Sequence, residues 1–229
     1  MDTRHEILRV ALESFAEHGY ERTTIAALRD RSGVSNGALF HHFPTKEAIA
    51  AALYVEAMED VQDGYRRLLD LPVADLAGAV ASIITHQLTW VSEHCDQARL
   101  LYSLDHLDPS SAAAGELGAL NRDLAAAWRR WLQPLIARGD LRDLPFEMMI
   151  AIVNGPAHAI CRRWLAGHLP GTPLEYAPEL IAAAVAGLTG TPTSSPPPRR
   201  VAPVLEVRLL DADDNVVAHG RAELRDGTR

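Results

Sequence analysis

Apolar side chains recur every three or four positions along most of the first 190 residues, which is the spacing of amphipathic helices. The first such face ends just before Gly19 and consists of Ile7, Leu8, Ala11, Leu12 and Phe15. Longer helices are expected over 47–71, 74–94, 97–107, 112–137, 144–165 and 176–188. The pattern therefore predicts an all-α chain as far as residue 190.

Residues 23–47 contain closely spaced helix signals. Thr24 and Ser35 are good N-caps for two short helices, and Gly33 between them can adopt positive φ in a tight turn. Pro44 ends the second short helix, and Thr45 caps the next one. Two helices joined by a short glycine turn are typical of a helix-turn-helix, although an ordinary three-helix packing unit has similar signals.

The second short helix has two different sides. Leu39 and Phe43 are expected to face the core, which leaves small or polar residues outward at the helix N-terminus, where base edges are read. Lys46 lies at the start of the following helix, where a cation and free backbone N–H groups favour a phosphate. This short helix has no Arg or Lys of its own, so bidentate Arg-to-guanine contacts from it are not expected.

The C-terminal residues follow a different pattern. Residues 191–203 are rich in Pro and Ser and predict an extended linker. Over 204–229, apolar and polar residues alternate on both sides of a polar turn cluster, which predicts a β-hairpin extension; a flexible tail is the alternative. We thus expect a helix-turn-helix domain over 1–46, a helical domain over 47–190, the linker, and the hairpin.

The formal net charge is −8, the opposite sign to that of most nucleic-acid binders. The acidity lies in residues 47–190, but the N-terminal domain is not a basic patch either. Modest non-specific DNA affinity is expected, with specific binding relying on a dimer that engages two half-sites.

Several other classes of protein are disfavoured. The charged N-terminus does not resemble a signal peptide, and the apolar stretch Met148–Cys161 is too short to span a bilayer. Cys95 and Cys161 do not make a disulfide scaffold, so a reducing cytoplasm fits. We find no catalytic nucleophile–base set, phosphate loop or metal-ligand constellation, and we expect neither an enzyme nor a cofactor.

The N-terminal motifs resemble those of the tetracycline-repressor (TetR) family of transcriptional regulators. They are Gly33-Val34-Ser35, Leu39-Phe40-His41-His42-Phe43 and Lys46-Glu47, and the resemblance covers roughly residues 5–55. Phe40 stands where the family usually has Tyr, so one phosphate hydrogen bond is missing. The resemblance assigns DNA contacts to Thr24, Ser35, Asn36, Gly37, Phe40, His41, His42 and Lys46.

The resemblance also implies a homodimer that binds a palindromic operator in double-stranded DNA and releases it when a small apolar or amphipathic effector binds the helical domain. The small-residue helix Ile181–Gly187 fits a dimer interface, or alternatively a buried core helix. An effector cavity is expected among inward-facing aromatic and polar residues, although simple core packing also explains them: Trp90, Tyr102, Trp128, Trp131, Phe146, Met149, Asn154 and His158. The competing hypothesis is an adaptor that has weakened DNA readout and binds partners through the hairpin.

Overall fold

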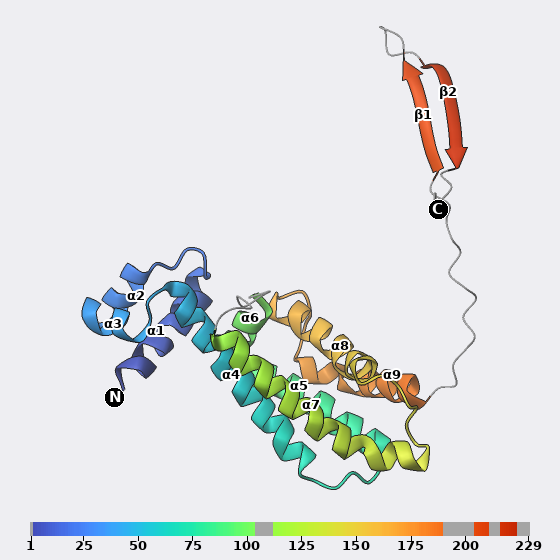
Figure 1. The fold of residues 1–229 in the computed structure, drawn as a ribbon, viewed down its shortest axis with the longest axis horizontal. Coiled ribbons are helices and arrows are strands. Elements are labelled where there is room, and N and C mark those ends of the chain that lie inside the picture. Colours follow the sequence, from blue (N-terminus) through green and yellow to red (C-terminus); the bar gives the residue numbers. More distant parts are fainter. Residues whose placement is uncertain (1, 104–111, 190–203, 211–215, 224–229) are drawn as a thin grey trace. The chain divides into compact units, whose positions relative to one another are not determined.

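The computed structural model describes residues 2–103, 112–189, 204–210 and 216–223, and its first two ranges are helical (Figure 1). The helices are α1 (Thr3–His18), α2 (Ile25–Ser32), α3 (Asn36–His42), α4 (Lys46–Leu69), α5 (Leu76–Glu93), α6 (Cys95–Ser103), α7 (Ala112–Arg138), α8 (Phe146–Leu165) and α9 (Ala177–Thr189), with a 3-10 turn, η1, over Pro173–Tyr176. The all-α prediction is confirmed for these residues, with helix ends that differ by a few positions. None of the described helices is long and apolar enough to cross a membrane.

The expected caps fix the helix-turn-helix. Side-chain oxygens of Thr24, Ser35 and Thr45 each accept a hydrogen bond from the backbone N–H three residues further on, at 3.1 to 3.2 Å. Gly33 follows α2 with φ 67° and ψ 11°, a left-handed conformation that glycine adopts without a steric penalty. These local signals set where α2, α3 and α4 begin.

Two apolar cores share one long helix. The first is enclosed by α1, α2, α3 and the start of α4, and the second by the rest of α4 with α5, α7, α8 and α9. Ile49 and Leu53 of α4 belong to the first core, whereas Val61 and Tyr65 belong to the second. The helix predicted to link the two parts of the chain is therefore packed into both (Figure 1).

A second element also reaches both cores, which the sequence pattern did not predict. Leu100 of α6 is only 4% exposed and packs in the first core, although it lies far along the chain from the other members of that core. Its neighbours Leu101 and Tyr102 pack against the second core. Helix α6 therefore connects the N-terminal helices with the helical body.

The chain divides into two units, Met1–Gly190 and Thr191–Arg229. In the second unit, strands β1 (Val204–Leu210) and β2 (Val216–Glu223) pair antiparallel, with Val204 opposite Glu223 and an irregularity between Leu209 and Leu210. The predicted linker over 191–203 and the turn cluster over 211–215 lie outside the described residues.

Candidate nucleic-acid interface and internal cavity

Helix α3 is anchored on one side and open on the other. Leu39 is fully buried and Phe43 is 5% exposed, which fixes the helix on the first core as expected. The outward residues Asn36, Gly37 and His41 are exposed, and the Phe40 ring is 48% exposed. An exposed, uncharged helix face with one free aromatic ring suits contacts with base edges and thymine methyl groups.

A cation missed by the sequence reasoning lies beside this face. Arg29 of α2 donates through Nη1 to Oδ1 of Asn36 at 3.3 Å, and its guanidinium also pairs with the carboxylate of Asp30. The helical spacing of α2 alone does not reveal this contact, because the turn at Gly33 brings the two helices together. Helix α3 thus has an arginine next to its N-terminus, although none in its own sequence.

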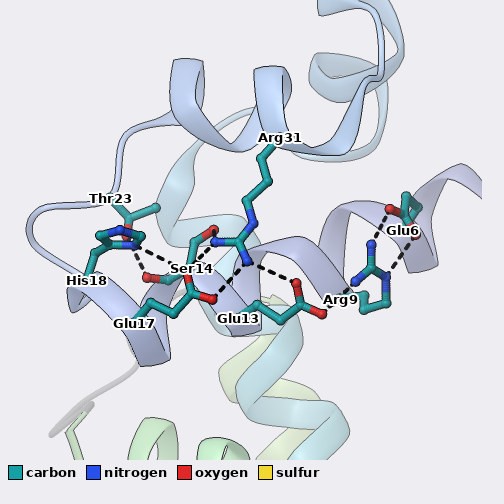
Figure 2. A network of polar contacts seen from close by, with 8 residues as sticks. All are labelled: Glu6, Arg9, Glu13, Ser14, Glu17, His18, Thr23 and Arg31. Carbon is teal, nitrogen blue, oxygen red and sulfur yellow. Dashed lines mark hydrogen bonds and ion pairs between the residues drawn. The ribbon is translucent and has the colours of Figure 1, made fainter.

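Arg31, also on α2, pairs with glutamates of α1 instead of lying beside α3 (Figure 2). Its Nη1 lies 2.6 Å from Oε2 of Glu17, and its Nη2 lies 3.3 Å from Oε2 of Glu13, both on α1. The hydrogen bond from Arg31 holds the pKa of Glu17 below its ordinary value. The buried hydroxyl of Thr23 adds a 3.3 Å hydrogen bond to the carbonyl of Ser14. These contacts fix the orientation of α2 on α1.

Lys46 is half-buried and already has partners. Its Nζ donates to the backbone carbonyl of Tyr20 at 3.0 Å and lies 4.1 Å from the centroid of the Tyr20 ring. A phosphate at the start of α4 would compete with that carbonyl for the ammonium group. Of the other expected phosphate contacts, Thr24 is exposed and His42 is half-buried.

A partly open cavity of about 410 Å³ lies between α4, α5, α6, α7 and α8. It contains four of the residues expected there: Trp90, Tyr102, Asn154 and His158. The remaining lining residues are Tyr54, Met58, Val61, Gln62, Tyr65, Gln87, Val91, Leu101, Asn121, Leu124 and Ile150. The size and the mainly apolar lining are typical of a small-molecule site.

The other four expected residues do not line this cavity. Trp128 and Met149 are buried around a separate void of about 20 Å³. Trp131 donates through Nε1 to the carbonyl of Leu71 at 2.8 Å, and the Phe146 ring lies 4.4 Å from the guanidinium carbon of Arg129. Helical periodicity identifies inward-facing residues, but it does not show which of them border an empty volume.

A chain of hydrogen bonds runs along the cavity wall. The Tyr65 hydroxyl donates to Oε1 of Gln87 at 2.6 Å, and Nε2 of Gln87 donates to the Tyr102 hydroxyl at 3.5 Å. The Tyr102 hydroxyl lies 2.7 Å from Nδ1 of His158. Burial raises the pKa of both tyrosines, while burial and then the charge of Arg162 lower the pKa of His158, so all of these groups are neutral near pH 7.

The described part of the chain gives little support for a metal site or a reactive cysteine. It contains no group of three or more His, Cys, Asp or Glu side chains placed to hold a metal ion. Cys95 and Cys161 are free thiols, and burial raises the pKa of Cys161 to about 11, which disfavours the nucleophilic thiolate.

Comparisons with known proteins agree with the helix-turn-helix geometry. The sequence profile of bacterial regulatory proteins of the tetR family matches residues 7–53. The chain is 26% identical over 196 residues to the transcriptional repressor KstR2 of Mycolicibacterium smegmatis, covering 81% of this chain and 90% of that protein. It is also 52% identical over 50 residues to the repressor AcnR of Corynebacterium diphtheriae, covering 22% of this chain and 26% of that protein.

The fold has close counterparts among solved structures. A regulatory protein of the tetR family from Rhodococcus RHA1 superposes with a TM-score of 0.68 at 22% identity, covering 82% of this chain and 97% of that one. The relatives named above are transcriptional repressors rather than enzymes. The helix-turn-helix over residues 7–53 matches the tetR family of bacterial regulatory proteins, and residues 2–103 and 112–189 have the helical fold of a solved member of that family.

Proposed function

We propose that this protein is a homodimeric transcriptional repressor of the cytoplasm that leaves a palindromic operator when a small molecule fills the cavity between α4 and α8. The observation that carries the DNA-binding part is the outward face of α3. It has no carboxylate, it exposes Asn36 and Phe40, and Arg29 lies beside it. This placement supports the DNA contacts proposed for Asn36, Gly37, Phe40 and His41.

The dimer part is supported by a face of small residues on α8 and α9. Ala151, Gly155 and Ala159 are exposed at intervals of four residues on α8, as are Ala182 and Ala186 on α9. A Cβ added at Gly155 would meet nothing within 4 Å in the protomer. Small side chains allow helices of two protomers to approach closely, so this face is suited to a helix-helix interface between two copies.

The release part is supported by the two helices that reach both cores. Val61 and Tyr65 of α4 line the cavity, and Leu53 of the same helix is in the first core. In α6, Tyr102 lines the cavity and Leu100 packs in the first core. A ligand that prefers a different placement of α4 or α6 thus shifts the spacing of the two α3 helices. A coupling of about 1–3 kcal/mol suffices for a several-fold to hundredfold loss of operator affinity.

Selection of bound duplexes from a random DNA pool tests the proposal. The expected product is a palindromic sequence whose half-sites lie about 34–36 Å apart, one turn of the double helix. An Asn36→Ala variant should lose preference at a base position near the centre of each half-site, whereas overall folding should be unchanged because Asn36 is exposed. Recovery of no motif with the wild-type protein would overturn the proposal.

The adaptor hypothesis remains the second candidate, because the C-terminal unit contains a two-stranded sheet of its own. Short two-stranded sheets are marginal alone in water, and such a sheet favours docking on another surface. Deletion of residues 191–229 separates the two functions. A repressor keeps its selected operator and its dimeric state, whereas an adaptor whose contacts reside in the tail loses its partner.

A further inference from the structure

The described lining of the cavity between α4, α5, α6, α7 and α8 is polar in places but has no charged side chain. It contains no Asp, Glu, Lys or Arg. Arg162 lies nearby, with its guanidinium carbon 5.7 Å from the centroid of the Tyr102 ring, but it is not part of the lining. A charged ligand group would lose its hydration here without gaining an opposite charge, which is costly. The described lining therefore favours an uncharged occupant.

Most polar side chains of the lining already pair with one another. Nε2 of Gln62 donates to Oδ1 of Asn121 at 2.7 Å. Tyr65, Gln87 and Tyr102 form the chain of hydrogen bonds described above, which ends at His158. These groups have little capacity left for a ligand, so recognition depends on the polar atoms that remain unpaired.

The chain of hydrogen bonds leaves the Tyr102 hydroxyl with a proton that it can donate, and we assign that proton to the 2.7 Å contact with Nδ1 of His158. Because Tyr65 donates to Gln87 and the amide of Gln87 donates to Tyr102, the Tyr102 proton is free to be donated to Nδ1 of His158. A neutral imidazole that accepts at Nδ1 carries its proton on Nε2. His158 therefore has a donor at Nε2 for which the described residues provide no hydrogen-bond acceptor.

Asn154 provides the complementary group. Its Oδ1 is buried and has no hydrogen-bond partner among the described residues, although Asn154 lines the cavity. Buried carbonyl oxygens without a partner are rare because they cost free energy. Asn154 and His158 are four residues apart on α8, and such residues are neighbours on one helix face. An unpaired acceptor and an unpaired donor thus lie side by side at the cavity wall.

We propose that the cavity takes an uncharged, largely apolar alcohol, whose hydroxyl donates to Asn154 and accepts from His158. A hydroxyl both donates and accepts, whereas an ether lacks the donor and a carboxylate brings a charge. This assignment rests on the proposed function, because it names the class of effector that fills the same cavity. It makes Asn154 the residue that distinguishes an alcohol from an ether.

Three probes of similar length test the assignment: 1-decanol, 1-methoxynonane and decanoate. Each is titrated at pH 7.5 into the wild type, Asn154→Leu and Arg163→Leu, with binding followed by tryptophan fluorescence and folding by thermal melts. The wild type is expected to bind decanol about tenfold or more tightly than either other probe, because only the hydroxyl satisfies the buried oxygen. Asn154→Leu should bring decanol and methoxynonane within about threefold of each other by removing that oxygen. Arg163→Leu, an exposed position of α8, should keep the wild-type difference.

Two results overturn the assignment. In one, methoxynonane or decanoate binds the wild type as tightly as decanol. In the other, folded Asn154→Leu keeps the preference for decanol. Release of the selected operator is measured with the same probes, so the two proposals fail separately. If decanoate alone releases the operator, the alcohol assignment is wrong but the cavity still binds the effector. If no probe binds, the alcohol assignment is also wrong, and the proposed repressor function is then judged by the operator-binding assay alone.

Discussion

Arg29 and Arg31 lie two residues apart on α2 and hold different partners. Arg29 contacts Asn36 at the start of α3, whereas Arg31 pairs with Glu13 and Glu17 of α1. Both side chains are about one third exposed, so accessibility alone does not distinguish them. Their partners distinguish the two arginines, because only Arg29 lies next to the face proposed to bind DNA.

This difference predicts unequal effects on DNA binding. Arg29→Ala should weaken operator binding several-fold and reduce the slope of log K against log salt by about one for each protomer, as loss of a phosphate contact does. Arg31→Ala should leave the salt slope unchanged, with a small loss of thermal stability from the exposed ion pairs. Fluorescence anisotropy at several salt concentrations measures both slopes. Equal slopes for Arg29→Ala and the wild type would exclude Arg29 from the interface.

His158 predicts a pH dependence of stability. Its pKa in the folded protein is below the ordinary 6.5, first through burial and then through the charge of Arg162, so the unfolded chain binds a proton more readily. The free energy of unfolding is therefore highest above pH 6.5 and falls as the pH drops through that value. Tyr102 and Cys161 also lie near the ring, but burial raises the pKa of both and they stay protonated in this range.

Urea unfolding between pH 7.5 and 5.5 measures this effect. The wild type should lose stability across the interval, and His158→Gln should lose less. The carboxylates whose pKa values are lowered by hydrogen bonds, such as Glu17, titrate below their ordinary 4.5 and do not contribute here. An equal loss in the variant would assign the pH dependence to other groups.

At the scale of elements, α4 and α5 approach closely at Gly64. A Cβ on Gly64 would overlap Cε1 of His86, whose Nε2 is 2.9 Å from the carbonyl oxygen of Val61. The imidazole also packs edge-on against Tyr65, with ring centroids 4.6 Å apart. This contact fixes the part of α4 that faces the cavity.

Gly64→Ala should therefore destabilise the protein despite the better helix propensity of alanine. We expect a loss of about 1–3 kcal/mol from overpacking against His86. Gly115→Ala on α7 is the matched control, because a Cβ there meets nothing within 4 Å, and it should be neutral or stabilising by about 0.5–1 kcal/mol. Urea unfolding compares the two, and similar values for both variants would contradict the close approach.

The elements that the sequence predicted best are those fixed by local signals. The caps at Thr24, Ser35 and Thr45 and the turn at Gly33 each depend on a few adjacent residues, and all four are confirmed. Contacts between distant helices were not predictable in the same way. The packing of Leu100 in the first core and the contact of Arg29 with Asn36 depend on how helices meet, which periodicity within one helix does not encode.

At the scale of the whole molecule, the small-residue face predicts how the dimer is broken. Gly155→Arg places a long, charged side chain on that face without a clash inside the protomer. The variant should be monomeric by analytical ultracentrifugation and should bind a palindromic duplex at least about tenfold more weakly, because the second half-site no longer adds avidity. Gly115→Arg, at another open glycine, should stay dimeric. If the Gly155→Arg variant is still a dimer, the dimer interface does not include this face of α8.

We propose above all that the α3 helices of two protomers bind one symmetric DNA site. The residues around each α3 contact the phosphates of that site. Titration of the selected duplex at several salt concentrations, together with the mass of the complex, tests it most directly. We predict one dimer per palindromic duplex and a steep fall of log K with log salt, with a slope near −0.9 for each phosphate neutralised. Negligible binding to any duplex at low salt would contradict it.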